Sequence, residues 1–117
     1  MITREFAEHF AKTWISAWNS HDLDLILSHY SDDFVMSSPY IAAIVGEASG
    51  TLVGKEAVGA YWRRALEAYP ALTFELISIL VGVESIVLYY QGVRGPVAVV
   101  FFFNSEGEVV RAAAHYA

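Results

Sequence analysis

Large aromatic residues recur at every fourth position near the start of the chain. The residues that share this spacing are Phe6, Phe10, Trp14 and Trp18. Only a helix places residues four apart on one face, and the Thr3 hydroxyl can cap its first turn, so a helix is predicted from Thr3 to about Asn19. After the polar break 19–21, Leu23, Ile26, Leu27 and Tyr30 repeat the spacing. They predict a second helix over 22–30 that meets the first at a tight corner.

A turn and a short strand are predicted to follow the second helix. Ser31-Asp32-Asp33 is typical of a turn, and Phe34 to Met36 begins an extended run that ends at Ser37-Ser38-Pro39. The next segment, 39–54, is apolar to Val45 and then rich in small residues. Its pattern is compatible with a pair of strands, with a mobile flap over a cavity mouth, or with a partly buried connection.

A third helix is predicted from Gly54 to Pro70, because the apolar positions again follow helical spacing. Its inner face would carry Val58, Tyr61, Trp62, Ala65, Leu66 and Tyr69, with Arg63, Arg64 and Glu67 on the solvent side. From Leu72 the pattern favours strands, which are predicted over 72–81, 84–91, 96–103 and 108–116, with glycines in the turns between them. Strands joined this tightly are antiparallel, so the fold class is α+β, with three N-terminal helices packed on a curved, mostly antiparallel sheet.

The strand over 97–103 is apolar on both of its faces. Val99, Phe101 and Phe103 share one face, and Ala98, Val100 and Phe102 share the other. An antiparallel sheet with one solvated face would not need the second apolar row. Something is therefore expected to cover the outer face as well.

Composition adds to this expectation and excludes some classes of function. The chain of 117 residues suffices for one domain, over 1–117, and 56% of its residues are hydrophobic, against about 45–50% in ordinary domains. The excess predicts a dimer interface or an apolar pocket. A net charge of −6 with seven scattered basic residues argues against nucleic-acid binding. With no cysteine and no run of apolar residues long enough for a membrane span, a soluble, cytoplasmic protein is expected.

Three segments carry a resemblance to a known family. They are WNSHDLDLILSHYSDDFVMSSP at 18–39, GKEAVGAYW at 54–62 and FFFNSEGEVVRAAA at 101–114. In this order the chain is similar to the nuclear transport factor 2-like superfamily, in particular to its SnoaL-like and ketosteroid isomerase-like members. The resemblance implies a cystatin-like cone with an internal pocket, and a homodimer formed through the outer face of the sheet. On the strand over 97–103 it implies that Val99, Phe101 and Phe103 point inward and that Ala98, Val100 and Phe102 point to the partner. It does not imply one activity, because this fold hosts enzymes, binding modules and transport adaptors.

The catalytic groups of the ketosteroid isomerase-like enzymes are not found at the matching positions. Alignment on LDLILSHYSDD places Ser38 at the base, Trp14 at the phenol and Val99 at the second donor of the oxyanion hole. Serine without a neighbouring base does not shuttle protons near neutral pH, and valine donates no hydrogen bond, so that mechanism is excluded on this alignment. The aspartate pair of the related epoxide hydrolases is also missing, since all four aspartates lie within 22–33.

Four residues remain as candidate acids and bases: Tyr30, Tyr40, Glu75 and His115. The register implied by the family turns Val110, Ala112, Ala114 and Tyr116 toward the cavity, and Val109, Arg111, Ala113 and His115 outward. Glu75 alternates with Phe74 and Leu76, which favours a solvated side chain. No spacing of metal ligands and no phosphate-binding loop is present, so no metal and no cofactor are expected.

Aromatic residues dominate the predicted interior of the cone. They are Trp14, Trp18, Tyr30, Tyr61, Trp62, Tyr89 and Tyr116, with Ser38 and Tyr40 as polar groups. The residues predicted to bind a ligand are Trp14, Trp18, Ser38, Tyr40, Trp62, Val99 and Ala112. The leading hypothesis is a domain that binds a small apolar or aromatic molecule. The alternatives are an isomerase, cyclase or hydrolase that uses Tyr30 or Tyr40 with Glu75 or His115, and a structural dimerisation domain with a solid core. The volume of the cavity and its ionisable lining separate the three.

Overall fold

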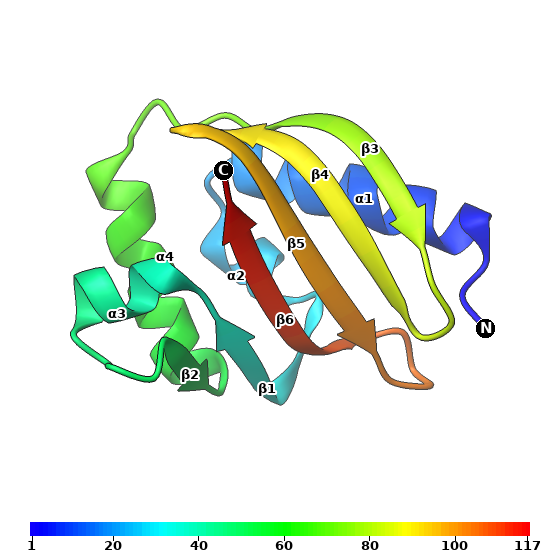
Figure 1. Ribbon diagram of the computed structural model, residues 1–117, viewed down its shortest axis with the longest axis horizontal. Helices are drawn as coiled ribbons and strands as arrows, with labels where there is room; N and C mark the ends of the chain where they lie inside the picture. Colours follow the sequence, from blue (N-terminus) through cyan, green and yellow to red (C-terminus); the bar gives the residue numbers. More distant parts are fainter.

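The computed structural model describes residues 1–117 and contains four helices and six strands. The helices are α1 (Arg4–Asn19), α2 (Leu23–Leu27), α3 (Pro39–Val45) and α4 (Lys55–Ala68). The strands are β1 (Tyr30–Ser37), β2 (Thr51–Val53), β3 (Glu75–Val81), β4 (Ser85–Gly92), β5 (Gly95–Phe103) and β6 (Val109–Tyr116). All six form one sheet in the order β2-β1-β6-β5-β4-β3 (Figure 1). Only β1 and β6 pair in parallel, which confirms the predicted α+β class with a mostly antiparallel sheet.

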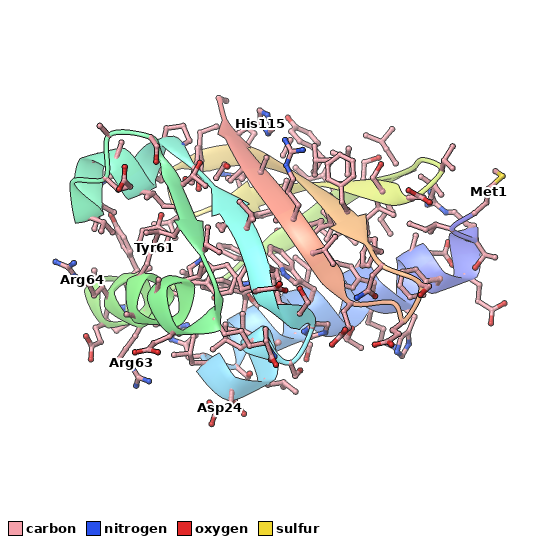
Figure 2. All side chains as sticks on the ribbon, turned by 90° about the horizontal axis from the view of Figure 1, so that it is seen from below. Met1, Asp24, Tyr61, Arg63, Arg64 and His115 are labelled. Carbon is pink, nitrogen blue, oxygen red and sulfur yellow. The ribbon has the colours of Figure 1, made fainter.

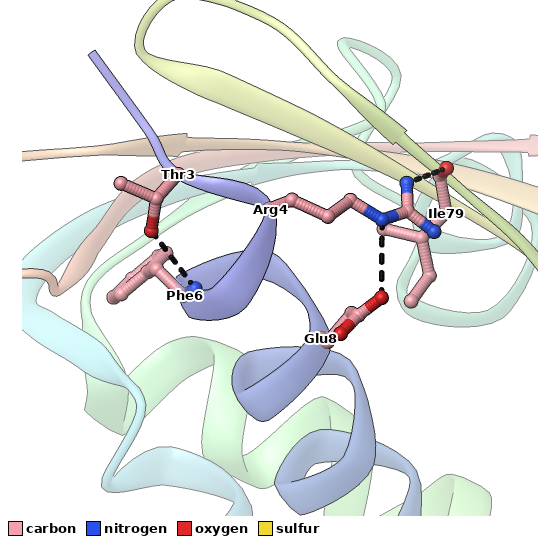
Figure 3. A network of polar contacts seen from close by, with 5 residues as sticks. All are labelled: Thr3, Arg4, Phe6, Glu8 and Ile79. Atoms are coloured by element: carbon pink, nitrogen blue, oxygen red, sulfur yellow. Dashed lines mark hydrogen bonds and ion pairs between the residues drawn. The ribbon is translucent and has the colours of Figure 1, made fainter.

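Helix α1 is tied to the sheet at its N-terminal end. The Thr3 hydroxyl accepts a hydrogen bond from the Phe6 amide at 3.0 Å, which confirms the predicted cap. The Arg4 guanidinium pairs with Glu8 and donates to the backbone oxygen of Ile79 on β3 at 2.8 Å (Figure 3). Because β3 is the last strand of the sheet, this bond occupies an otherwise free carbonyl on its edge. The helix can then lay its aromatic stripe along the inner face of the sheet.

Helix α2 is shorter than the spacing predicted. It ends at Leu27, and Tyr30 opens β1 instead of closing the helix. The Val109 amide of β6 donates to the His29 oxygen at 2.9 Å, so the chain leaves the helix to begin pairing with a strand eighty residues later in the sequence. Tyr30, Phe34 and Met36 all point inward from β1. An apolar residue at position 30 fits the helical spacing that begins at Leu23 and also the alternation of buried residues along β1. The pairing with β6 decides in favour of the strand.

The segment 39–54 forms a short helix and a strand rather than a flap. Ser38 caps α3 through its hydroxyl, Pro39 occupies the first turn, and Gly46 ends the helix with a φ of 82°. These are ordinary start and stop signals for a helix. Pro39 is also typical of the end of a strand, and for this reason the sequence predicts three helices, one fewer than the structure contains. Strand β2 pairs antiparallel with β1.

Helix α4 begins after Gly54, as predicted, and buries Val58, Tyr61 and Trp62. Strand β3 begins at Glu75 rather than at Leu72. A turn precedes it, in which the Leu72 amide donates to the Tyr69 oxygen, and the Asn19 side chain bonds both backbone groups of Phe74. Helix α1 thereby fixes the point at which the chain enters the sheet.

The inner face of the sheet forms the core, and the face predictions hold except at Tyr89 and at the start of β6, where Val109 and Val110 were predicted the other way round. Val99, Phe101 and Phe103 on β5 are buried as predicted. Tyr89 was predicted inside but is 37% exposed on the outer face, because Tyr90 beside it takes the inward position of β4. Val109 was predicted to point outward but is buried, because the pairing of β5 with β6 shifts between Phe102 and Phe103.

The outer face of the sheet carries no helix (Figure 1). Leu80 on β3, Tyr89 on β4 and Phe102 on β5 are 56%, 37% and 37% exposed. Burying such side chains would be favourable by roughly 25 cal/mol per Å² of apolar surface removed from water. The face is thus suited to contact with another apolar surface.

Candidate ligand-binding cavity

A cavity of about 370 Å³ lies between α1, α3, α4 and the inner face of the sheet. Twenty of its 24 lining residues are hydrophobic. All three tryptophans of the chain and six of its seven tyrosines line it. Figure 2 shows Tyr61 pointing from α4 toward the sheet, while Arg63 and Arg64 point away from it. The aromatic stripe of α1 and the inner face of α4 together explain why these rings converge.

The deep part of the cavity is built from Trp14, Trp18, Tyr30 and Trp62. The Trp14 indole N–H donates to the Tyr30 hydroxyl at 3.0 Å, and both side chains are buried. The ring centroids of Tyr30 and Trp62 are 5.1 Å apart, and those of Trp18 and Trp62 are 5.3 Å apart. The buried Trp18 Nε1 has no hydrogen-bond partner, and the Trp18 ring packs against the rings of Trp14, Trp62 and Phe74. This region is a tightly packed aromatic wall with one internal hydrogen bond.

A second polar group lies where α3 meets the end of β6. The Ser38 hydroxyl is 3.3 Å from the Tyr116 hydroxyl and accepts a hydrogen bond from the Tyr40 amide at 3.2 Å. The Tyr40 and Tyr116 rings are 4.3 Å apart between centroids. Ser38 therefore caps α3 and positions Tyr116, whose ring lines the cavity.

The buried phenols of the cavity remain protonated at neutral pH. Burial raises the pKa of Tyr30 far above its ordinary value, and the hydrogen bond from Trp14 offsets this only in part. Burial and the neighbouring Tyr116 raise the pKa of Tyr61 to about 12. Burial likewise raises the pKa of Tyr90 and of Tyr116. These hydroxyls can donate hydrogen bonds to a ligand but cannot act as bases near pH 7.

Arg94 is the one charged side chain among the lining residues. It lies in the turn between β4 and β5, and its Nη2 donates to the Tyr69 hydroxyl at 2.9 Å. The guanidinium carbon lies 5.8 Å from the centre of the Tyr40 ring. Arg94 therefore joins this turn to α3 and to the end of α4, at the rim of the cavity.

The structure brings most of the predicted ligand-binding residues together. Trp14, Trp18, Tyr40, Trp62 and Val99 line the cavity. Ala112 does not, because it lies in the core beneath it, whereas Ala114 and Tyr116 on the same strand face the open space. Ser38 does not line the cavity, but its hydroxyl is within hydrogen-bond distance of the Tyr116 hydroxyl, and the Tyr116 ring does line it.

The four candidate acids and bases are separated. Tyr30 and Tyr40 line the cavity, but Glu75 and His115 are exposed and do not. His115 lies on the outer side of the sheet, opposite α4, and its Nδ1 is 3.3 Å from the Ala98 oxygen (Figure 2). No cluster of three or more His, Cys, Asp or Glu side chains that could hold a metal is present. The lining side chains include no carboxylate and no imidazole.

Sequence reasoning missed Tyr90, Phe74 and Arg94 as lining residues. Tyr90 could have been found, because neighbouring residues of a strand face opposite sides and one of Tyr89 and Tyr90 had to point inward. Arg94 has no such signal. A turn residue follows no periodicity, and its proximity to Tyr40 and Tyr69 depends on how three distant segments pack.

Comparison with known proteins shows the family. The model of the SnoaL-like domain matches residues 11–116. The chain belongs to the SnoaL-like domain family. A SnoaL-like protein of unknown function from Burkholderia thailandensis is 56% identical, with a TM-score of 0.97 over 99% of this chain and 98% of that one.

More distant structures share the fold of this SnoaL-like domain. A nuclear transport factor 2-like protein from Anabaena variabilis is 17% identical, with a TM-score of 0.77 over 100% of this chain and 95% of that one. An Agrobacterium tumefaciens protein provisionally assigned as an isomerase of the SnoaL-like family is 15% identical, with a TM-score of 0.73 over 94% and 96%. At such identities the likeness shows the fold alone. No curated protein matches the chain, and none of its helices is both long and apolar enough to cross a membrane.

The raised tyrosine pKa values predict that stability is lost at alkaline pH. A phenol with a higher pKa in the folded state stabilises the fold below its unfolded pKa of about 10, and this contribution disappears as the pH rises toward the folded pKa. Each fully buried tyrosine should lower the free energy of unfolding by up to about 1.4 kcal/mol per pH unit above pH 10. Urea unfolding at a series of alkaline pH values measures this slope, and Tyr30→Phe should make it shallower. A stability that stayed constant to about pH 11 would contradict the burial of these hydroxyls.

Proposed function

We propose that this SnoaL-like domain binds a small, flat, largely apolar or aromatic molecule in its cavity. The observation that carries the proposal is an open space of about 370 Å³ walled by three tryptophans and six tyrosines. Sites for small molecules have volumes of about 300–1,000 Å³, and aromatic lining with a few polar groups is typical of them. A domain with a purely structural role would not need to leave this space unfilled, because filling a cavity stabilises a core.

The polar groups of the cavity limit what kind of molecule it holds. The lining phenols with raised pKa values, Tyr30, Tyr61, Tyr90 and Tyr116, are neutral and offer hydroxyl groups. Aromatic faces suit a planar ring system, and hydroxyls suit its oxygen substituents. The ligand class that fits is therefore a ring system with a small number of oxygen acceptors.

Binding accounts for this cavity better than a reaction does. A general base must lie within hydrogen-bond reach of the proton it removes and have a pKa near the working pH. Glu75 and His115 do not line the cavity, and the buried phenols have pKa values well above neutrality. The alternative isomerase, cyclase or hydrolase thus has no supporting group in the lining.

Tryptophan fluorescence tests the proposal directly, because all three tryptophans line the cavity. Neutral 2-naphthol should quench this fluorescence saturably, with a Kd of roughly 1–100 μM, as expected for a small ligand making few polar contacts. Ala65→Phe places a ring in the cavity from α4 and should weaken binding at least about tenfold by steric exclusion.

Ala60→Phe is the matched control, because Ala60 is exposed on the same helix and does not line the cavity. It should bind 2-naphthol as the unsubstituted protein does. Quenching that does not saturate, or equal affinity in the Ala65→Phe and Ala60→Phe variants, would refute binding in this cavity.

We also propose that a second copy of the chain covers the outer face of the sheet. The proposal is supported by the exposed apolar side chains on β3, β4 and β5 and by the dimers that the family resemblance implies. An isologous pair places each exposed ring against the same face of its partner. Its test is given in the Discussion.

A further inference from the structure

We propose that the ligand carries a carboxylate, which Arg94 binds at the rim while the apolar body of the molecule occupies the cavity. This inference rests on the proposed function and names the chemical class of its ligand. The observation behind it is the charge of one residue that lines the cavity. Arg94 is the one charged side chain among residues that are otherwise apolar or neutral.

Arg94 is held in place by the fold. Its turn joins β4 to β5 where Gly92 pairs with Gly95. A Cβ atom on Gly92 would lie 2.8 Å from the Val97 side chain, so only glycine allows this close approach. The Tyr69 hydroxyl accepts from Arg94 Nη2, and the Tyr40 ring lies beneath the guanidinium. Planar guanidinium groups are oriented well by such a combination of stacking and hydrogen bonding.

The charge of Arg94 has no anionic partner within the chain. Acidic residues outnumber basic ones by 13 to seven, yet the two ion pairs of the structure join Arg4 to Glu8 and Lys55 to Asp32. The hydrogen bond to Tyr69 uses one N–H of a group that has five, so the exposed guanidinium keeps donors free at the rim of the cavity. A bound anion would accept hydrogen bonds from these donors.

A carboxylate suits this position better than other charged groups do. Its two oxygens match the planar fork of a guanidinium in a bidentate pair. A phosphate dianion would be left with an uncompensated charge next to one cation in a chain of net charge −6. A cationic ligand would find no acidic side chain in the lining. The structure therefore favours an aromatic or apolar monocarboxylic acid.

Two probes of the same shape test this inference. We expect 2-naphthoate, which is ionised at pH 7, to bind about tenfold more tightly than neutral 2-naphthamide, because only the anion forms a charge-assisted pair with Arg94. Titration calorimetry or tryptophan fluorescence at low salt measures both affinities. Arg94→Gln should abolish the preference by weakening 2-naphthoate alone. Arg94→Lys, which keeps the charge but loses the fork, should retain a smaller preference.

Arg63→Gln is the matched control, because Arg63 is exposed on the solvent side of α4 and does not line the cavity. It should keep the full preference for 2-naphthoate. Equal binding of both probes to the unsubstituted protein, or an equal loss of preference in the Arg63→Gln and Arg94→Gln variants, would overturn the inference and leave the proposed function standing. Failure of both probes to bind the unsubstituted protein would instead refute the proposed function.

Discussion

Trp14→Ala is expected to lower the free energy of unfolding by about 4 kcal/mol, within the range of about 3–5 kcal/mol measured when large aromatic residues are truncated in cores. Trp14 is 3% exposed, and its ring contacts Trp18, Phe74, Tyr90 and Phe101. Its removal also leaves the buried Tyr30 hydroxyl without its donor. Loss of a partner by a buried polar group typically costs about 1–3 kcal/mol, so the effect should not fall at the lower end of the range.

Urea denaturation measures this loss, with Lys12→Ala as the matched control. Lys12 is exposed on the same helix, and its truncation should change the stability by less than about 0.5 kcal/mol. A loss below about 1 kcal/mol for Trp14→Ala would mean that the ring contributes little packing and mainly borders open space. The same measurement therefore separates the structural role of Trp14 from its role as a lining residue.

Phe102→Asp is expected to convert the proposed homodimer into a monomer at the concentrations used for sedimentation. Phe102 is 37% exposed on the outer face of β5, and the Arg111 guanidinium lies 5.3 Å from its ring centre. In an isologous interface the substitution would bury a carboxylate on each side of the contact. A charge removed from water without full pairing costs several kcal/mol, enough to raise the dissociation constant more than about a thousandfold.

Leu25→Asp is the matched control for this substitution. Leu25 is also apolar and exposed, but it lies on α2, away from the outer face of the sheet. It should leave the sedimentation coefficient unchanged. A dimer that persists in Phe102→Asp, or one that is lost equally in Leu25→Asp, would contradict pairing through the outer face. Circular dichroism of each variant confirms that a monomer is folded.

Local patterns in the sequence predicted the elements wherever one pattern prevailed. Aromatic residues four apart fit a helix, whose side chains return to the same face every three to four residues, so α1 was predicted correctly. Glycines separate the late strands, and these strands were therefore also predicted. Ser38-Pro39 is an instructive failure. The pair marks the end of β1 and also the beginning of α3, and an interpretation that allowed one role missed the helix. Ser38 and Pro39 are signals for both elements, because the chain passes from β1 into α3 without a loop between them.

Tyr30 shows a different kind of limit. Its spacing from Leu23 and Leu27 fits a helix, yet it begins a strand because β6 pairs with the chain at His29. No local window around Tyr30 contains β6. The switch from helix to strand then brings the Tyr30 hydroxyl within 3.0 Å of Trp14 and builds the deep wall of the cavity.

Local sequence alone determined the α1 stripe, the alternating strands and the composition with few charges, because each of these belongs to single residues or to spacings within one element. Tertiary structure alone decided that Tyr90 rather than Tyr89 faces the cavity and that β6 turns Val109 inward. It also placed Arg94 beside Tyr40 and Tyr69 at the rim. These outcomes depend on the pairing of strands and on the packing of segments far apart in the chain, where the free energy of many contacts outweighs the preference of any one residue.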